Sequence, residues 1–220
     1  MIDHIFINGC SFNQINPKGN VNTFAGEIIA KYFKKEFTNF SRGGRGNYRI
    51  CTTTKMWYEK QSKNNSFAII EWTSPFRRDY PTNDGWKPMK ELNTTWRSWS
   101  TTSSISLSKD QTGWDFDQEH SLFMLNAILD LQYYFKAKNI PYIMYHGLPG
   151  DIKLDNNDHQ LLWNAVDLDH FYAPMKSQAE FVNESKLFVS DNDYHPTAEG
   201  HRQWAVEIIE FIKSKGIFNV

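Results

Sequence analysis

The sequence predicts an α/β fold in which a mainly parallel sheet of five strands lies between two layers of helices. Short runs of strand composition alternate along the chain with segments of helical periodicity, and this order is typical of parallel sheets. One of these runs, FAIIEW at residues 67–72, is almost continuously apolar, as expected for a strand that helices cover on both faces.

Length and composition indicate a folded chain without a strong charge. A length of 220 residues suits a single domain, which we expect to span residues 1–220. Apolar residues make up 40% and charged residues 22%, as in ordinary soluble proteins. With 24 basic and 25 acidic residues the net charge is -1, so no general field attracts nucleic acids or anionic membranes.

The compartment is inferred from the N-terminus and the cysteines. The sequence shows neither a signal peptide nor an apolar run of roughly 18 residues that could span a membrane. Cys10 and Cys51 are the two cysteines, which fits a reducing compartment. We expect a cytoplasmic protein with no nucleic-acid or membrane partner. The sequence leaves open its oligomeric state and any association with a virion or another assembly.

The first elements are two strands with a helix between them. HIFIN at residues 4–8 has strand composition, and apolar residues spaced four apart predict a helix over 22–35. FTNF at 37–40 is the second strand. The three-glycine stretch at 41–47, SRGGRGN, must be a loop, because helices and strands tolerate such a stretch poorly.

The middle of the chain supplies a helix, a strand and a long insertion. Asn47 is a favourable N-cap for a helix that reaches about residue 61, and residues 67–72 form the third strand. The segment 75–117 is rich in Trp, Ser and Thr and lacks periodicity. Loops of this length are commonly functional.

The last third of the chain continues the alternation. Apolar residues at spacings of four, three and four predict a helix over 118–138, and residues 140–147 form the fourth strand. A helix is expected around 158–168, and KLFVS at 186–190 is the fifth strand. The final helix is expected between residues 197 and 215, with lysines and a glycine at its end.

Several chemically capable residues directly follow the predicted strands. Ligands of parallel α/β sheets bind beyond the carboxyl ends of the strands, where the sequence places Ser11, the glycines of 43–46, Thr73 and the segment SDNDYHP at 190–196. A serine, a glycine-rich loop and a histidine with nearby acids would therefore meet at one edge of the sheet.

This set of residues suits acyl transfer. A serine hydroxyl needs a base that is itself oriented by a carboxylate, and Ser11 with His195 and one of Asp191 and Asp193 could supply all three groups. Negative charge on the attacked carbonyl oxygen needs preorganised donors. The Ser11 amide and a glycine amide from 43–46 could provide them.

Two rival chemistries receive less support. Cys10 adjoins Ser11, but neighbouring side chains point in different directions and one histidine cannot serve both, so we expect a small buried residue. The seven histidines are scattered without HExxH or paired CxxC motifs, and DLDH at 167–170 is a weak cluster. We therefore expect no metal site.

Four segments in order resemble the conserved blocks of the SGNH (GDSL-like) hydrolases, in the divergent form whose first block reads G-C-S-F. They are INGCSF, NFSRGGRGN, IIEWTSPFRR and DYHPTAEGHRQWA. The resemblance implies a flavodoxin-like three-layer α/β/α fold and ester hydrolysis through an acyl-enzyme, without metal or cofactor. It implies that Ser11 is the nucleophile and His195 the base. It also implies that the Ser11 amide and Gly44 belong to the oxyanion hole, with Gly46 as the competitor of Gly44.

The sequence departs from the family pattern at two places. The position three residues before the histidine, where the family has its acid, holds Asn192; we favour Asp193 as the acid, with Asp191 as the alternative. The third block lacks the asparagine that the family uses as an oxyanion donor. Thr73 could replace it, or the side chain of Asn47 or Arg78 could reach the site.

The function expected from these observations is hydrolysis of carboxylic esters, for example removal of acetyl groups from a small ester or an acylated glycan. The insertion at 75–117 would emerge beside the site, where its tryptophans could bind sugar rings or instead form a small core of their own. The alternative is a catalytically weak or inactive module of the same fold that binds carbohydrate through the Trp-rich rim.

Overall fold

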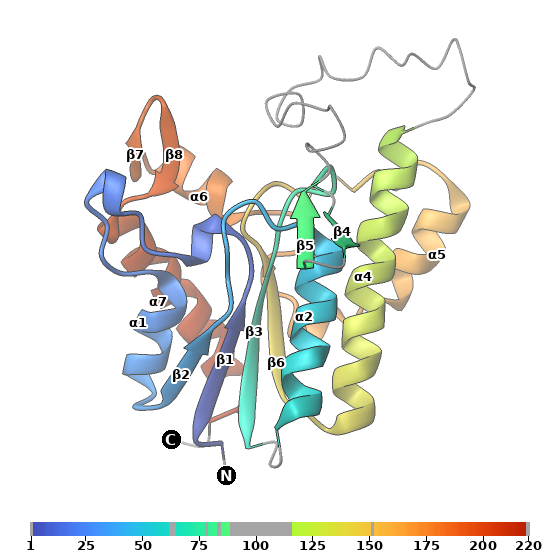
Figure 1. Ribbon diagram of the computed structural model, residues 1–220, viewed down its shortest axis with the longest axis horizontal. Helices are drawn as coiled ribbons and strands as arrows, with labels where there is room; N and C mark the ends of the chain where they lie inside the picture. Colours follow the sequence, from blue (N-terminus) through green and yellow to red (C-terminus); the bar gives the residue numbers. More distant parts are fainter. Residues whose placement is uncertain are drawn as a thin grey trace.

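A computed structural model of the chain describes residues 2–61, 65–77, 79–82, 85–88, 116–150 and 152–218. Its centre is a four-stranded sheet with the strand order β2-β1-β3-β6 (Figure 1). The strands are β1 (His4–Asn8), β2 (Glu36–Asn39), β3 (Ser66–Trp72) and β6 (Tyr142–His146). All pairings in this sheet are parallel, so the four carboxyl ends form one edge, which we call the carboxyl edge.

Helices cover both faces of this sheet (Figure 1). One face packs against α1 (Ala25–Tyr32) and α7 (Ala198–Ser214), which also contact each other. The other face packs against α2 (Asn47–Lys60) and α4 (Phe116–Lys138), with α5 (Asn157–Ala165) beside α4. The predicted three-layer α/β/α arrangement is confirmed.

The strand sequences explain why both faces are covered. Successive side chains of a strand point to opposite faces. In β1, Phe6 packs into the α2/α4 layer, whereas Ile5 and Ile7 pack into the α1/α7 layer. In β3, Ile70 and Ile69 divide in the same way. Each strand therefore supplies apolar residues to two cores.

The sheet has four strands, so the expectation of a fifth strand at 186–190 is wrong in one respect. These residues do form a strand, β7 (Phe188–Ser190), but it pairs antiparallel with β8 (Asp193–Pro196) outside the main sheet. A turn of two residues reverses the chain directly after β7, and the side chains of β7 are only partly buried or exposed. A short strand of this kind pairs with the next residues along the chain and does not enter a covered sheet.

The remaining described segments lie mainly around the carboxyl edge. After β1 and before α1 come the short 3-10 helices η1 (Ser11–Asn13) and η2 (Pro17–Gly19), and η6 (Leu168–His170) and α6 (Gln178–Glu184) precede β7. Within the part of the chain that the structure describes, no helix has the length and apolar character needed to cross a membrane.

The predicted insertion at 75–117 begins with regular structure. Strands β4 (Asp79–Thr82) and β5 (Gly85–Pro88) pair antiparallel. Residues 89–115, which contain Trp96, Trp99 and Trp114, lie outside the described residues.

Candidate active site

Ser11 lies directly beyond the carboxyl end of β1, at the start of η1. The side chain of Asn13 stabilises the turn formed by η1 through two hydrogen bonds. Its amide group donates to the Tyr145 hydroxyl at 3.0 Å, and its oxygen accepts the Gly26 backbone N–H at 3.1 Å. Because Tyr145 belongs to β6 and Gly26 to α1, the serine is held against both the sheet and a helical layer.

Asn8, the last residue of β1, joins this strand to α2 and to the glycine-rich loop. Its amide group donates to the Ile50 carbonyl at 3.1 Å and to the hydroxyls of Thr53 and Thr54 at 3.0 and 2.9 Å. Its oxygen accepts from the buried Arg45 guanidinium at 2.8 Å. Burial lowers the pKa of Arg45 to about 10, so the group stays cationic at neutral pH.

Ser11, His195 and Asp193 form a continuous chain of hydrogen bonds. Nε2 of His195 lies 2.8 Å from the Ser11 hydroxyl oxygen, and Nδ1 lies 2.5 Å from Oδ1 of Asp193. The same Oδ1 accepts the backbone N–H of His195 at 3.1 Å, and Oδ2 accepts the Asn16 amide at 2.9 Å. The carboxylate thereby favours the tautomer with the proton on Nδ1, which leaves Nε2 as an acceptor.

The β7–β8 hairpin and the start of α7 bring His195 to Ser11. In Figure 1 the hairpin stands at the carboxyl edge beside the segment that follows β1, and β8 contacts η1. Thr197 caps α7, because its hydroxyl accepts the Gly200 N–H at 3.1 Å and donates to the Leu187 carbonyl at 3.0 Å. The Phe12 ring packs on His195 with 5.1 Å between ring centroids. The imidazole ring of His195 is therefore held by both the β7–β8 hairpin and the turn that carries Ser11.

The surroundings of Asp193 and His201 determine the protonation states of these two side chains. Burial raises the pKa of Asp193, but the hydrogen bonds from Asn16 and His195 outweigh this effect and hold the pKa below its usual value. The second histidine near the site, His201, is buried and accepts the Ala25 N–H at 3.3 Å. Burial, with the nearby His195, lowers the pKa of His201 to about 4. His201 is therefore neutral at neutral pH.

The glycine-rich loop places backbone N–H groups near Ser11. The N–H of Arg45 donates to the Arg42 carbonyl at 3.4 Å, and Gly44 within this turn has a φ of 76 degrees, which glycine adopts without strain. A Cβ on Gly43 would lie 3.8 Å from the Ser11 Cβ. Among the described residues, the amides of Ser11, Gly43 and Gly44 have no hydrogen-bond acceptor, so they stay candidates for the oxyanion donors.

Two further oxyanion candidates from the sequence are engaged elsewhere in the structure. The Gly46 amide donates to the Asp79 carboxylate at 2.8 Å. The side chain of Asn47 accepts the Thr73 N–H at 2.9 Å and donates to the Thr73 carbonyl at 3.0 Å. Asn47 is also not the N-cap of α2, because it is the first residue of the helix and Gly46 occupies the cap position. The polar groups of Gly46 and Asn47 therefore stabilise the fold and are not free for an oxyanion.

Three other candidates have different outcomes. The Thr73 hydroxyl is buried and has no hydrogen-bond partner among the described residues. Asp191 is exposed in the turn between β7 and β8, and the described contacts of His195 do not include it. Arg78 lies outside the described residues. Of the two acids considered, the structure brings only Asp193 to the histidine.

Cys10 is fully buried beneath the serine turn, as expected for a small core residue. Its thiol donates to Glu71 at 2.8 Å. Burial raises the pKa of the Cys10 thiol to about 12, and the charge of Glu71 adds to this effect. The thiol is therefore protonated at neutral pH, and a protonated, buried thiol is a poor nucleophile.

Sequence reasoning missed several residues that support the site, namely Asn8, Asn16, Arg45, Glu71 and His201. The acid within the mostly apolar strand of residues 66–72 was a visible signal for Glu71. The others carry no local signal, because their partners come from distant segments of the chain.

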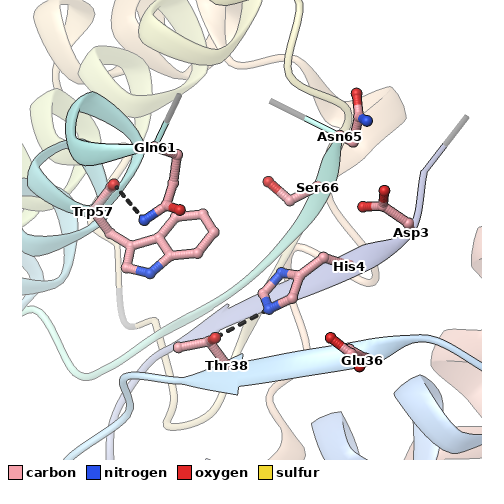
Figure 2. A pocket seen from close by; sticks show the side chains of 8 residues that line it. All are labelled: Asp3, His4, Glu36, Thr38, Trp57, Gln61, Asn65 and Ser66. Carbon is pink, nitrogen blue, oxygen red and sulfur yellow. Dashed lines mark hydrogen bonds between the residues drawn. The ribbon is translucent and has the colours of Figure 1, made fainter. Parts of the chain in front are cut away.

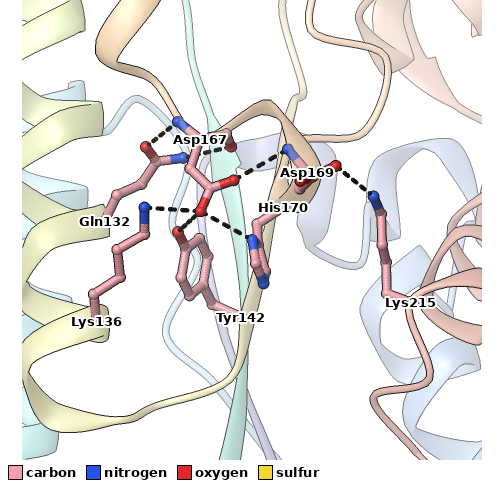
Figure 3. Close-up of polar contacts among 7 residues, drawn as sticks. All are labelled: Gln132, Lys136, Tyr142, Asp167, Asp169, His170 and Lys215. Atoms are coloured by element: carbon pink, nitrogen blue, oxygen red, sulfur yellow. Dashed lines mark hydrogen bonds and ion pairs between the residues drawn. The ribbon is translucent and has the colours of Figure 1, made fainter.

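The weak DLDH cluster is a network of ion pairs (Figure 3). Asp167 lies 2.9 Å from Lys136 and 3.2 Å from Nδ1 of His170, and Asp169 lies 3.1 Å from Lys215. Lysine side chains thus neutralise both carboxylates. Across the described ranges, no group of three His, Cys, Asp or Glu side chains is placed to hold a metal ion.

A hollow of about 570 Å³ opens at the opposite end of the sheet, where β1 and β3 begin (Figure 2). Within it His4 stacks on Trp57 with 5.6 Å between ring centroids and bonds to the Thr38 hydroxyl at 3.0 Å. Neither Ser11 nor His195 lines this hollow. The candidate site is therefore the carboxyl edge, where the hydrogen-bonded residues meet.

Solved structures share the fold of this chain. A psychrotrophic esterase, EstA from Pseudoalteromonas sp., solved with monoethylphosphonate as inhibitor, aligns with a TM-score of 0.56 and 11% identity over 96% of this chain and 97% of its own. The acetyl xylan esterase Est2A from the rumen bacterium Butyrivibrio proteoclasticus aligns with a TM-score of 0.51 and 13% identity over 97% of this chain and 64% of its own. A structure described as a carbohydrate esterase gives a TM-score of 0.51 at 12% identity, over 96% of this chain and 65% of its own.

No protein-family model and no curated protein matches the sequence. At identities this low, the likeness to the three esterases is one of fold. The chain therefore has the α/β/α fold of these esterases, and its chemistry has to be argued from its own residues.

Proposed function

We propose that this chain is a serine hydrolase of the SGNH type that cleaves carboxylic esters through an acyl-enzyme. The observation that carries the proposal is the hydrogen-bond chain from Ser11 through His195 to Asp193, at 2.8 and 2.5 Å. The fold shared with esterases and the order of the SGNH-like segments along the chain support it. The more general conclusion, a hydrolase with a small ester substrate, rests on the same observations.

The first half of the reaction forms the acyl-enzyme. As Oγ of Ser11 attacks the ester carbonyl carbon, Nε2 of His195 takes the hydroxyl proton and the C=O electron pair moves onto oxygen. The tetrahedral intermediate collapses, the bond to the alcohol oxygen breaks, and Nε2 returns its proton to the leaving alcohol. Asp193 stays ionised throughout and stabilises the transient imidazolium.

The second half repeats these steps with water. His195 takes a proton from the water molecule as its oxygen attacks the acyl carbon. The tetrahedral intermediate then releases the carboxylic acid, and the proton returns to Oγ of Ser11. Both halves need donors for the negative carbonyl oxygen.

We assign the oxyanion donors to the Ser11 amide and to an amide of the glycine turn. Gly44 is the residue that the family resemblance favours, and Gly43 lies beside Ser11. Among the described residues, Thr73 is the remaining candidate for a third donor, because the Asn47 amide is bonded to the Thr73 backbone. Loss of one donor typically lowers turnover about 10²- to 10³-fold, so we expect a slow enzyme.

We propose acylated carbohydrate, and acetyl esters in particular, as the finer substrate class. Two of the proteins with this fold are described as an acetyl xylan esterase and a carbohydrate esterase. Beside the site, Tyr194 and Ile15 are 57% and 51% exposed. Such apolar surfaces suit the C–H faces of sugar rings. The Tyr194 ring packs against Phe188 with 5.4 Å between ring centroids, on the hairpin that carries His195.

Hydrolysis of p-nitrophenyl acetate by the wild type and by Ser11→Ala tests the proposal. We expect the substitution to lower kcat by about 10³-fold or more. The matched control is Ser214→Ala, which changes an exposed serine at the end of α7. Equal rates for wild type and Ser11→Ala would contradict the proposal.

The alternative, a carbohydrate-binding module with little activity, is favoured by one observation, the absence of a free Asn47 donor. Release of acetate from acetylated xylan oligosaccharides by the wild type would support the enzyme and its finer substrate class. Binding of these oligosaccharides by both wild type and Ser11→Ala, without acetate release by either, would support the module.

A further inference from the structure

Glu71 is a buried acidic side chain in a strand whose other members are mostly apolar. Every residue of β3 is buried, and Glu71 has no exposed surface. Burying a carboxyl group is strongly unfavourable unless it forms hydrogen bonds. The contacts of Glu71 therefore indicate what this residue does, and the proposed reaction does not use it directly.

The contacts of Glu71 are with Cys10, the residue before the proposed nucleophile. Oε1 accepts the backbone N–H of Cys10 at 3.2 Å and its thiol at 2.8 Å. Oε2 is buried and has no hydrogen-bond partner among the described residues. One carboxylate oxygen thus fixes both the main chain and the side chain of Cys10.

The hydrogen bonds of Cys10 determine the orientation of the Ser11 amide. The carbonyl of Cys10 accepts the Asn13 N–H at 3.3 Å. This carbonyl and the Ser11 N–H belong to one planar peptide group, so fixing the carbonyl also fixes the direction of the N–H. Glu71 holds the preceding peptide at the Cys10 N–H, and the proposed oxyanion donor is therefore held through both sides of Cys10.

Two glycines next to Glu71 leave room for its side chain. A Cβ on Gly9, directly after β1, would lie 2.6 Å from the Cβ of Glu71. A Cβ on Gly147, directly after β6, would overlap the carboxylate oxygen Oε1. Glycine directly follows β1 and β6 at the two places where the Glu71 side chain lies, so the backbone can approach that side chain closely.

The Glu71 carboxyl changes its protonation state at a lower pH than the neighbouring Cys10 thiol and Tyr145 hydroxyl. Burial raises the pKa of Glu71 to about 7, although hydrogen bonds from Cys10 and the charge of Arg77 oppose this rise. The pKa of the Cys10 thiol is raised to about 12. Burial, with the charge of Glu71, raises the pKa of Tyr145 well above its usual value. Near neutral pH only Glu71 in this group changes its charge.

We propose that Glu71 is a positioning residue whose ionised carboxylate fixes the turn that carries Ser11, through the amide and the thiol of Cys10. The inference rests on the proposed function only in taking Ser11 as the nucleophile. Protonation replaces charge-assisted hydrogen bonds by weaker neutral ones. It also adds an O–H group where the described residues offer no acceptor. The turn then loosens, and activity falls as Glu71 becomes protonated.

The test follows the Glu71 carboxyl and the residue-11 amide by NMR, from about pH 5 to about pH 9. The samples are wild type, Ser11→Ala and Glu71→Gln, with ¹³C-carboxyl glutamate and ¹⁵N backbone labels. We expect one glutamate to titrate at pH about 7 and the residue-11 amide to shift with the same midpoint. Glu71→Gln should lose both signals. Ser11→Ala should keep both signals. The test of Glu71 can therefore be read even if Ser11 is not a nucleophile.

Kinetics with p-nitrophenyl acetate separate positioning from general stability. We expect Glu71→Gln to lower kcat about tenfold or more while KM stays within about twofold, because the transition state depends most on the donor geometry. Cys10→Ser keeps a hydrogen-bond donor and should retain most of the activity, whereas Cys10→Ala should not. The proposal would be overturned if the NMR signal of the residue-11 amide did not shift while Glu71 titrates. It would also be overturned if Glu71→Gln had the kcat and pH profile of the wild type.

Discussion

Replacing Asp193 by asparagine changes one charge and one oxygen at the centre of the site. In the structure Oδ1 faces two N–H groups of His195, and Oδ2 faces the Asn16 amide. If the new NH₂ group faced His195, Nδ1 would have to give up its proton, and Nε2 could no longer accept from Ser11. If it faced Asn16, two amide donors would meet, because the Asn16 oxygen already accepts the Gly19 N–H at 3.2 Å. Either orientation loses a contact.

The magnitude follows mainly from the lost charge. At the observed separation of 2.5 Å, a unit pair interacts by roughly 7 kcal/mol at an effective dielectric constant of about 20, and by roughly 2 kcal/mol in water. The His195 and Asp193 side chains are 35% and 29% exposed, so the interaction lies between these limits. We expect kcat to fall about 10²- to 10⁴-fold with KM within about threefold, because the imidazolium exists only during the reaction.

Initial rates of p-nitrophenyl acetate hydrolysis measure this loss. The matched control is Asp191→Asn, the same chemical change two positions earlier in the chain at an exposed site. We expect it to stay within about twofold of the wild type, as surface substitutions usually do. The reasoning is refuted if Asp193→Asn keeps kcat within about threefold of the wild type, or if Asp191→Asn loses as much.

Three further expectations concern stability. Gly9→Ala places a Cβ 2.6 Å from the Glu71 Cβ and should lower the free energy of unfolding by about 1 to 3 kcal/mol; an unchanged urea midpoint would contradict this. Because the pKa of Glu71 is raised from 4.5 to about 7, the folded state keeps a proton that the unfolded state releases in this window. Wild-type unfolding free energy should therefore fall as pH rises through it, by about 1.4 kcal/mol per pH unit from this group. Glu71→Gln should lack this slope, and equal slopes in the two proteins would refute the assignment. Asn16→Ala removes a hydrogen bond that lowers the pKa of Asp193, and a lowered pKa contributes stability that is lost as pH falls through it. The variant should lose less stability than the wild type as pH falls through and below 3.8, the ordinary pKa of an aspartate, and identical acid unfolding curves would count against the bond.

The sequence predicted the layered fold because its main elements carry their own signals. A strand such as β3, buried on both faces, is apolar enough to recognise, and the helix of residues 116–138 carries a regular apolar stripe. The misplaced fifth strand shows where such signals end. Composition marks Phe188–Ser190 as a strand, but its partner depends on the immediate reversal of the chain, which composition does not report.

The candidate site was predictable where residues directly follow strands and not where contacts are distant. Ser11 stood out because it follows β1 at the carboxyl edge. His195 was expected there because it follows the predicted fifth strand; that strand lies outside the sheet, and His195 reaches the edge on the β7–β8 hairpin. The preference for Asp193 over Asp191 depends on geometry and on Asn16, which is 177 residues away in the sequence. Gly46 and Asn47 looked available because nothing local reveals that Asp79 and the Thr73 backbone bond to them.

Reaction with a fluorophosphonate ester, followed by mass spectrometry of the digested protein, tests the nucleophile most directly. A hydroxyl activated by a neighbouring histidine attacks phosphorus, expels fluoride and keeps the phosphonyl group. We expect a single adduct on the peptide that contains Ser11, absent in Ser11→Ala and formed much more slowly in His195→Ala. A wild-type protein that forms no adduct, or forms it on another residue, would contradict the account.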